Sequence, residues 1–218
     1  MLEPTGVTLT ALRERPEGIS VPVELRYRRH AMAQGDGVVG FATPSRRVEI
    51  YAGALLDVGQ SPLPDYVEPA ASPASRPDLA ARYPLVLTSA KVVQFCHSQH
   101  RNLPRLRRHS PEPQVELHPS TAQARGIETD DWVVIETPRA TMRARARVVK
   151  SLAPDVVCAQ YGWWQACEPL GLTGYETVGP GAANYNALID TEVTDPLSGS
   201  VPLRSSLCEV RRLDGAPA

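Results

Sequence analysis

The sequence predicts a mainly β fold of short strands and few helices, preceded by an extended proline-rich segment. From about residue 81 onward, short apolar or alternating runs are separated by clusters of turn-forming residues, a pattern typical of strands. Residues 1–80 hold 9 of the 21 prolines and little sustained periodicity, so this part can follow a neighbouring surface but cannot bury a core of its own. We therefore expect an extended segment and linker at residues 1–80, docked on the following domain or on a partner, and one domain at residues 81–218.

Six strands are expected in this domain, at residues 84–87, 114–118, 132–137, 142–150, 156–161 and 207–212. The fourth alternates small apolar residues with Arg143, Arg145 and Arg147, which is typical of a half-buried strand with a cationic outer face. One short helix is expected at residues 119–125, because a proline opens it and Gly126 follows its end.

Length, composition and charge exclude several classes of protein. The 218 residues suffice for one good core, and a hydrophobic content of 42% is ordinary for a globular protein. A formal net charge of −1 argues against general polyanion binding, and no run approaches the roughly 18 apolar residues of a membrane span. The N-terminus lacks the basic region and apolar core of a secretory signal, and the four cysteines lack metal-ligand spacing. We expect a cytoplasmic chain without membrane insertion, whose cysteines are reduced and buried.

The stretch from residue 83 to residue 108 carries the strongest signal of a binding site. A short apolar strand leads into Thr88, Ser89 and Lys91, and then into residues 96–101, which combine hydroxyl, amide, imidazole and cationic side chains. A rigid strand that feeds such a loop is a common way to present a polar ligand site. An anion or a polar heterocycle suits these groups. Each residue taken alone could equally cap the strand and face water.

Several motifs together resemble a known family. The letters LVLTSAK at residues 85–91 and HSQHRNLP at residues 97–104 are similar to the start of the C-terminal, molybdopterin-dinucleotide-binding domain of the molybdopterin oxidoreductases. That family includes dimethyl sulfoxide reductase, formate dehydrogenase and thiosulfate or polysulfide reductase. Four further motifs follow the family's order: GFATPSRRVE at residues 40–49, GWW at 162–164, NYNAL at 184–188 and DPLSG at 195–199.

The resemblance implies a double-psi six-stranded β-barrel with short helices and a site for molybdopterin guanine dinucleotide. The implied cofactor-binding residues are Thr88, Ser89, Lys91, His97, Ser98, Gln99, Arg101, Trp163, Asn184 and Asn186. The first three would hold the guanosine and pyrophosphate, while His97, its two successors and Asn186 would orient the pterin.

Other readings of single residues stay open. His97 could be a structural histidine, one of the two adjacent tryptophans is expected in the core, and the Asn-x-Asn pair could bond its own backbone in a turn. The sequence also departs from the family, which has Arg where Lys91 stands and Gly where Arg46 stands. Lys keeps the charge but lacks the planar fork of Arg.

The resemblance also implies what lies outside this chain. Complete enzymes of the family carry an N-terminal iron–sulfur module and a metal ligand further along. An iron–sulfur cluster needs closely spaced thiolates, and the sequence contains none, so neither a cluster nor a metal or catalytic residue is expected here. The chain would be the C-terminal part or subunit of a molybdenum or tungsten oxidoreductase, inactive without a larger partner that carries the cluster and the metal ligand.

Two rival functions remain at this stage. One is a non-catalytic module that binds or delivers the molybdopterin cofactor, or an inactive remnant. The other is a nucleic-acid-binding barrel that uses Arg101, Arg105, Arg107, Arg108 and the arginines of residues 143–147. Alternating cations on a strand more often form a solvated face, and few aromatic residues interrupt the basic stretches, so no nucleic-acid partner is expected.

Overall fold

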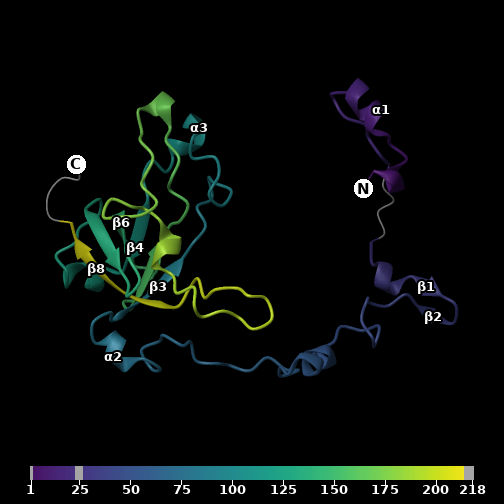
Figure 1. The fold of residues 1–218 in the computed structure, drawn as a ribbon, viewed down its shortest axis with the longest axis horizontal. Helices are drawn as coiled ribbons and strands as arrows, with labels where there is room; N and C mark the ends of the chain where they lie inside the picture. The colour runs from purple at the N-terminus through teal and green to yellow at the C-terminus, as the bar shows by residue number, and fades with distance from the viewer. Residues whose placement is uncertain (1, 23–26, 214–218) are drawn as a thin grey trace. The chain divides into compact units, whose positions relative to one another are not determined.

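The structure, a computed structural model, describes residues 2–22 and 27–213. The chain forms two compact units, Met1–Tyr66 and Val67–Ala218, which are called the N-terminal unit and the barrel unit and are described separately (Figure 1). The boundary between the units lies before the residue 80 expected from composition, since residues 67–80 belong to the barrel unit.

Short local elements make up the N-terminal unit. They are η1 (Glu3–Thr5), α1 (Leu9–Glu14), η2 (Arg29–Ala31), β1 (Ala33–Gln34), β2 (Gly37–Val38) and η3 (Gly53–Val58). The Thr8 side chain caps α1 by accepting a 3.1 Å hydrogen bond from the Ala11 N–H. No described residue of this unit is buried, and Ile50 is 81% exposed. The elements are therefore held by local hydrogen bonds and not by a core.

A tight turn in this unit explains one departure from the family motif. Arg46, where the family has Gly, adopts the left-handed conformation with φ 58°. Its N–H donates to the Thr43 carbonyl at 3.0 Å, and its carbonyl accepts from the Phe41 N–H at 2.9 Å. The guanidinium also donates to the Val39 carbonyl at 2.9 Å. These bonds offset the strain of a left-handed non-glycine residue.

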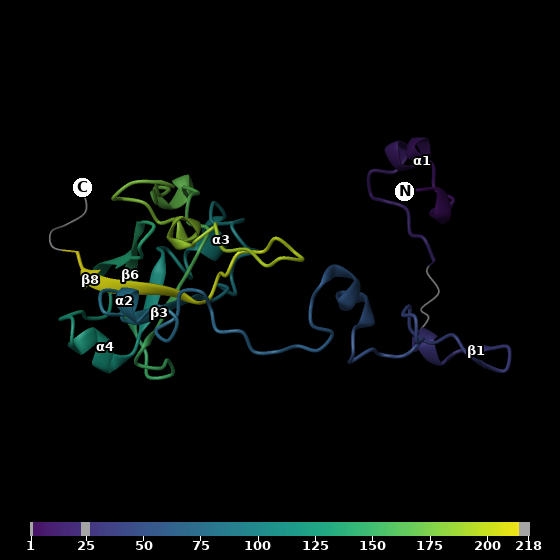
Figure 2. The ribbon, with the colours of Figure 1, turned by 60° about the horizontal axis from the view of Figure 1, so that its bottom comes forward.

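The barrel unit is built on a closed barrel with the strand order β3-β7-β4-β6-β5-β8 (Figures 1 and 2). The strands are β3 (Leu85–Ser89), β4 (Gln114–Leu117), β5 (Trp132–Glu136), β6 (Thr141–Val148), β7 (Val156–Ala159) and β8 (Ser206–Arg212). The helices are α2 (Pro77–Ala80), α3 (Pro104–Arg107), α4 (Pro119–Gln123), η4 (Glu168–Leu170) and η5 (Tyr185–Leu188). The predicted mainly β, six-stranded barrel with short helices is confirmed.

Alternating burial shows which faces of the strands form the core. In β6 the side chains of Met142, Ala144 and Ala146 are at most 1% exposed, and the arginines between them point outward, as the alternation predicted. Leu87 and Leu117 are fully buried in the same cluster. Full burial of such a side chain is worth about 1.5–3 kcal/mol. Small residues inside β6 suit the narrow interior of a small barrel.

The strand directions determine which strand termini lie at the same end of the barrel. β3 runs parallel to β7, with Ser89 beside Ala159, and β4 runs parallel to β6. β8 starts beside β3, with Ser206 opposite Leu87, and β5 ends where β6 begins. The last residues of β3, β5 and β7 and the first residues of β4, β6 and β8 therefore lie at the same end, which is called the site end.

The structure tests the expectations that the cysteines are buried and that no segment inserts into a membrane. All four cysteines are free; Cys167 and Cys208 are buried and Cys158 is half-buried, but the expectation of burial is wrong for Cys96, which is exposed in the loop after β3. Among the residues that the structure describes, no helix has the length and apolar character to cross a bilayer.

Candidate functional site

The last residues of β3 and the loops at the site end carry all ten residues that the family resemblance singled out. Thr88 and Ser89 are the last residues of β3, and residues 91–101 form the loop that follows. Trp163 lies in the loop after β7, and Asn184 and Asn186 lie in and beside η5. The Arg143 N–H of β6 donates to the Ala182 carbonyl at 2.8 Å, which fixes the η5 segment beside the start of that strand.

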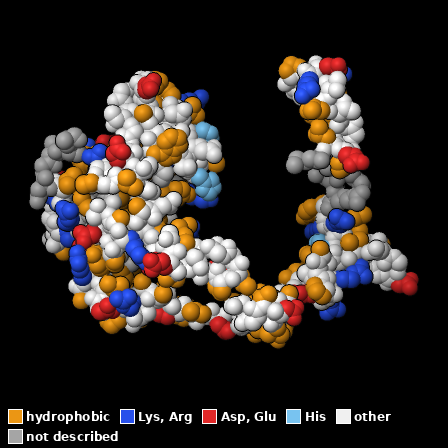
Figure 3. Space-filling view, viewed as in Figure 1, with side chains coloured by type: hydrophobic (Ala, Val, Ile, Leu, Met, Phe, Trp, Pro, Cys, Tyr) orange, Lys and Arg blue, Asp and Glu red, His pale blue; other side chains and the backbone are white. Residues whose placement is uncertain are grey.

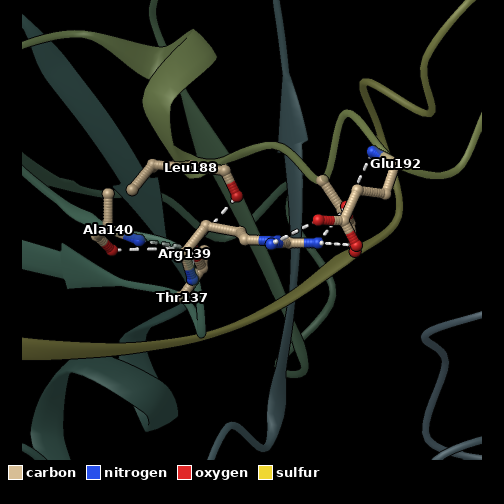
Figure 4. Close-up of polar contacts among 6 residues, drawn as sticks. Thr137, Arg139, Ala140, Leu188 and Glu192 are labelled. Carbon is tan, nitrogen blue, oxygen red and sulfur yellow. Dashed lines mark hydrogen bonds and ion pairs between the residues drawn. The ribbon is translucent and has the colours of Figure 1, made fainter.

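A second set of bonds fixes the other side of the η5 segment (Figure 4). The Thr137 hydroxyl, in the turn after β5, donates to the Leu188 carbonyl at 3.0 Å. Arg139 pairs with Asp190 at 2.6 Å and with Glu192 at 2.9 Å. The Glu192 backbone N–H, which donates to the Asp190 carboxylate at 3.0 Å, and secondarily Arg139 lower the pKa of Asp190. A groove of about 900 Å³ opens beside this turn. The asparagine segment is thus held from two neighbouring strand ends.

The loop after β3 has a strained backbone where the candidate residues lie. His97 (φ 51°) and His100 (φ 72°) both adopt the left-handed conformation, which costs about 1–3 kcal/mol for a residue with a side chain. Gly162 of the neighbouring loop (φ 80°) packs on it: a Cβ atom there would lie 2.7 Å from the Ser98 Cα. Only glycine fits this contact, so the two loops touch backbone to backbone.

Arg101 holds these two loops in place from the interior of the protein. Its side chain is 1% exposed, and its two terminal nitrogens donate to the His97 carbonyl at 2.8 Å and to the Tyr161 carbonyl at 2.6 Å. The Arg101 backbone N–H donates to the Gln165 side-chain oxygen at 3.0 Å. Burial and the nearby positive charge of Arg107 lower the pKa of Arg101 to about 10. Arg101 therefore acts on the loop backbone from inside the protein.

Trp163 lies in the same buried layer. It is 2% exposed, with the Arg101 guanidinium 4.8 Å and the Arg107 guanidinium 4.9 Å from its ring centre. Phe95 meets its edge, with ring centres 5.8 Å apart. The adjacent Trp164 is 54% exposed. Trp163 is thus the tryptophan in the core and supports the loops from behind, while Trp164 offers its ring to the surface.

Other candidate side chains face outward without partners. Lys91, His97, Ser98, Gln99 and Asn186 are exposed, and within residues 2–22 and 27–213 no hydrogen bond or ion pair engages their side chains. Figure 3 shows histidine side chains at the surface of the barrel unit. Together these residues offer amide, hydroxyl, imidazole and ammonium groups to a ligand.

The remaining candidates are engaged within the chain. The Asn184 side chain accepts from the Asn186 N–H at 3.1 Å and donates to the Thr177 carbonyl at 3.0 Å, so it forms the backbone-bonding turn considered from the sequence. Ser89 is half-buried at the end of β3, and burial raises the pKa of the Tyr185 hydroxyl, which donates to the Leu203 carbonyl. Thr88 is half-buried at the end of β3.

Sequence reasoning missed the role of Arg107. It appeared only among surface cations, yet it is 1% exposed and donates to the carbonyls of Pro111 at 2.7 Å and Gln165 at 2.9 Å. A nucleic-acid surface that needs Arg101 and Arg107 loses both cations to the interior. Gly162 was quoted only as part of a motif, although a glycine directly after a predicted strand was a usable signal for close backbone approach.

Comparison with known proteins identifies the family. A family model described as "Molydopterin dinucleotide binding domain" matches residues 85–207. The chain belongs to this family. The resemblance found in the motifs is therefore confirmed, and the match contains every candidate residue named above. No group of three or more His, Cys, Asp or Glu residues that could hold a metal ion occurs in the described part of this family member.

Several larger proteins share this domain. Dopamine dehydroxylase of Eggerthella lenta is 34% identical over 176 residues, which cover 78% of this chain and 17% of that protein. Dimethyl sulfoxide reductase DmsA of Escherichia coli is 32% identical over 132 residues, which cover 56% of this chain and 16% of that protein. The solved structure of acetylene hydratase from Pelobacter acetylenicus matches with a TM-score of 0.72 at 26% identity and covers 97% of this chain and 28% of its own. The chain spans well under half the length of these relatives.

The site end fits the cofactor that the family name implies. Among the described residues, the Arg101 Nε and the Trp163 Nε1 are buried polar atoms without hydrogen-bond partners, and both belong to side chains that support these loops. Outward amides and hydroxyls match the donor and acceptor edges of a pterin or a guanine, and the Lys91 ammonium matches a phosphate.

Proposed function

We propose that this chain is the cofactor-holding C-terminal part or subunit of a molybdenum or tungsten oxidoreductase that uses molybdopterin guanine dinucleotide. The observation that carries the proposal is the group of outward, unpartnered polar side chains on the strained loop after β3, held from below by Arg101. Strained backbone persists where the surrounding structure enforces it, and such positions cluster at ligand sites.

The candidate residues divide into two roles. Thr88, Ser89 and Lys91, at the end of β3, would hold the guanosine and pyrophosphate, and His97 to Gln99 with Asn186 would orient the pterin. Arg101, Trp163 and Asn184 would act indirectly, by fixing the backbone that carries the others. The cofactor, with its metal, supplies the redox chemistry when bound, and the protein supplies binding and orientation.

Energetics support a requirement for a partner. Hydrogen bonds to charged groups contribute about 1.5–3 kcal/mol each, whereas association costs about 4–15 kcal/mol before net affinity appears. The contacts from one barrel end therefore give weak binding, so tight retention needs further domains. A larger partner would supply the metal ligand and the iron–sulfur cluster. Residues 1–80 would dock on the barrel or on that partner, and the exposed apolar residues of the N-terminal unit favour the partner.

Native mass spectrometry of the chain, purified from its own cells under reducing conditions, tests this proposal. We expect a complex with a larger protein that carries the mass of one or two pterin dinucleotides and a metal. A bare 23.7 kDa monomer would instead favour the unloaded module or remnant.

Site variants of the same complex sharpen the test. We expect Lys91→Gln, His97→Gln and Asn186→Ala to lower the pterin content several-fold without lowering the unfolding midpoint, because these exposed side chains have no partners within the described chain. Lys150→Gln is the matched control, since Lys150 is an exposed lysine after the last residue of β6, at the opposite end of the barrel. Equal pterin loss in Lys150→Gln and Lys91→Gln would contradict the assigned site.

A further inference from the structure

Positive charge is concentrated on one short stretch of the barrel unit. Residues 91–111 contain five Lys or Arg and three His, but no Asp or Glu. Two of the arginines are buried beneath the loops, whereas Arg105, Arg108 and His109, in and directly after α3, are exposed. Figure 3 shows histidine side chains on the flank of the barrel unit where Figure 1 places α3. This flank therefore presents guanidinium and imidazole groups together.

No carboxylate of the described chain neutralises the exposed arginines of this flank. Several other arginines of the barrel unit pair with acids, and Glu112, the first acidic residue after α3, pairs with Arg145 of β6 at 2.9 Å. Glu168 of η4 is exposed and pairs with neither Arg105 nor Arg108. Throughout residues 2–22 and 27–213, no ion pair or side-chain hydrogen bond engages these two arginines. Their charges are therefore available to attract an anionic partner.

Two exposed apolar side chains adjoin these cations. Leu103 directly precedes α3 and is 43% exposed, and Trp164, in the loop after β7, is 54% exposed. The two stretches of backbone lie side by side, because the Cys167 thiol donates to the Asn102 carbonyl at 3.4 Å. Trp and Arg are among the residues that most often dominate binding at protein–protein interfaces. The flank thus combines the residue types found at the centre of an interface.

We propose that this flank is a docking surface for a protein that presents acidic residues around an apolar centre. The docking residues, called the α3 patch, are His100, Leu103, Arg105, Arg108, His109 and Trp164. Carboxylates of the partner would accept hydrogen bonds from the guanidinium and imidazole groups, and its apolar centre would cover the indole. None of these six is among the ten candidate cofactor residues, so the inference goes beyond the proposed cofactor function.

A nucleic acid fits the α3 patch less well than a protein does. Nucleic-acid binding neutralises a series of phosphates along a backbone, whereas this patch exposes two arginines, since Arg101 and Arg107 are each only 1% exposed. Its one indole also offers no row of rings on which successive bases could stack. Protein interfaces, in contrast, obtain most of their affinity from a few Arg and Trp side chains.

Binding of a fluorescein-labelled, Glu-rich peptide with leucines at its centre to the full chain, measured by anisotropy, tests the α3 patch. We expect the double variant Arg105→Gln/Arg108→Gln to weaken binding about tenfold, because two charge pairs are lost. The matched control is Lys150→Gln/Arg211→Gln, which removes two exposed charges at the opposite end of the barrel. We expect the control to weaken binding less than about twofold, because salt screens distant exposed charges.

A further variant tests the apolar part of the α3 patch. We expect Trp164→Ala to weaken binding of the Glu-rich peptide about fivefold. A peptide with serine in place of the central leucines should bind this variant and the original chain equally. The unfolding midpoints of the Arg105→Gln/Arg108→Gln and Trp164→Ala chains should match that of the original chain, because these side chains are exposed. A charge-preserving double variant, Arg105→Lys/Arg108→Lys, should bind within about threefold of the original chain.

Several results would overturn the α3 patch. These are no binding of the Glu-rich peptide by the original chain, equal losses in the two Gln double variants, and equal binding of a peptide in which Gln replaces Glu. Tighter binding of an RNA oligonucleotide than of the peptide, lost in Arg105→Gln/Arg108→Gln, would assign the patch to nucleic acid instead. None of these results depends on the dinucleotide content of purified complexes, so the α3 patch and the cofactor function fail separately.

Discussion

The two units of the chain are stabilised by different means. In the barrel unit, strands far apart in sequence pair and bury a shared core in which Leu87, Leu117 and Val133 are fully inaccessible. In the N-terminal unit no described residue is buried, and turns such as the one at Arg46 are closed by bonds within a few residues. The barrel unit thus buries its own core, whereas the described part of the N-terminal unit leaves apolar side chains such as Ile50 exposed.

Truncation of matched leucines should reveal this contrast most strongly. We expect Leu117→Ala to lower the free energy of unfolding by about 2–5 kcal/mol, since it leaves a cavity in the closed core. Leu56→Ala removes the same atoms from a residue in η3 that is 52% exposed. We expect this variant to change the free energy of unfolding by less than about 0.5 kcal/mol. Urea denaturation of the whole chain measures both. A loss above about 2 kcal/mol for Leu56→Ala would show that the N-terminal unit shares the core's stability.

A pair of glycines with the same local constraint offers a second contrast. An added Cβ would lie 2.7 Å from backbone at Gly162 and 2.6 Å from backbone at Gly40, and both residues have positive φ. We expect Gly162→Ala to destabilise the barrel by about 1–3 kcal/mol, because the contacting loop must shift and the residue is strained. Gly40→Ala should leave the barrel transition unchanged, since the atoms nearest an added Cβ belong to Arg46 of the N-terminal unit. Thermal unfolding of both variants measures the two effects. Equal shifts in the unfolding midpoint would contradict the separate stabilisation of the two units.

Alkaline pH should produce the smallest of the three effects, and only in the barrel unit. Tyr185 is 2% exposed and donates to the Leu203 carbonyl at 2.7 Å, and burial raises its pKa above the ordinary 10.0. The unfolded chain loses this proton near its ordinary pKa while the folded chain keeps it. The contribution to stability is therefore complete below about pH 10 and is lost as the pH rises further.

The variant Tyr185→Phe isolates this contribution. We expect it to cost about 1 kcal/mol at neutral pH through the lost hydrogen bond and to flatten the decline of unfolding free energy above pH 10. Urea titrations at neutral and alkaline pH measure both quantities. Burial also raises the pKa of the Cys208 thiol from its ordinary 9.0. In Tyr185→Phe the free energy of unfolding should therefore still decline, more gently, from about pH 9 upward. If the free energy of unfolding of Tyr185→Phe declines above pH 10 as steeply as that of the original chain, groups other than Tyr185 cause the loss of stability.

Local sequence predicts the strands of this fold well, because burial alternates along β4, β6 and β7 and the others are short apolar runs. The alternation of Met142, Ala144 and Ala146 located β6, and the observed strand ends lie within about two residues of those expected, which is the usual uncertainty of element ends. The order around the barrel depends on pairing between distant strands, such as β3 with β7 and β8. No local pattern encodes it, so the barrel topology came from the family resemblance.

The sequence predicted the location of the candidate site but not the buried residues that support it. The stretch from Tyr83 to Arg108 stood out because a polar loop follows an apolar strand. Nothing near Arg107 distinguished it from the exposed Arg105, since its carbonyl partner at Gln165 lies far along the chain. Alternation predicted that the two tryptophans face opposite ways, but the left-handed turn at Gly162 decides that Trp163 is the buried one.

The closing strand has a consequence for synthesis. β8 pairs with both β3 and β5, although almost the whole barrel unit separates β3 from β8 in sequence. Until residues 206–212 emerge from the ribosome, the growing chain carries two open strand edges, which are prone to pair with other chains. Because the loops of the site end are anchored on strands that this closure joins, we expect the site to form only after translation of the last strand.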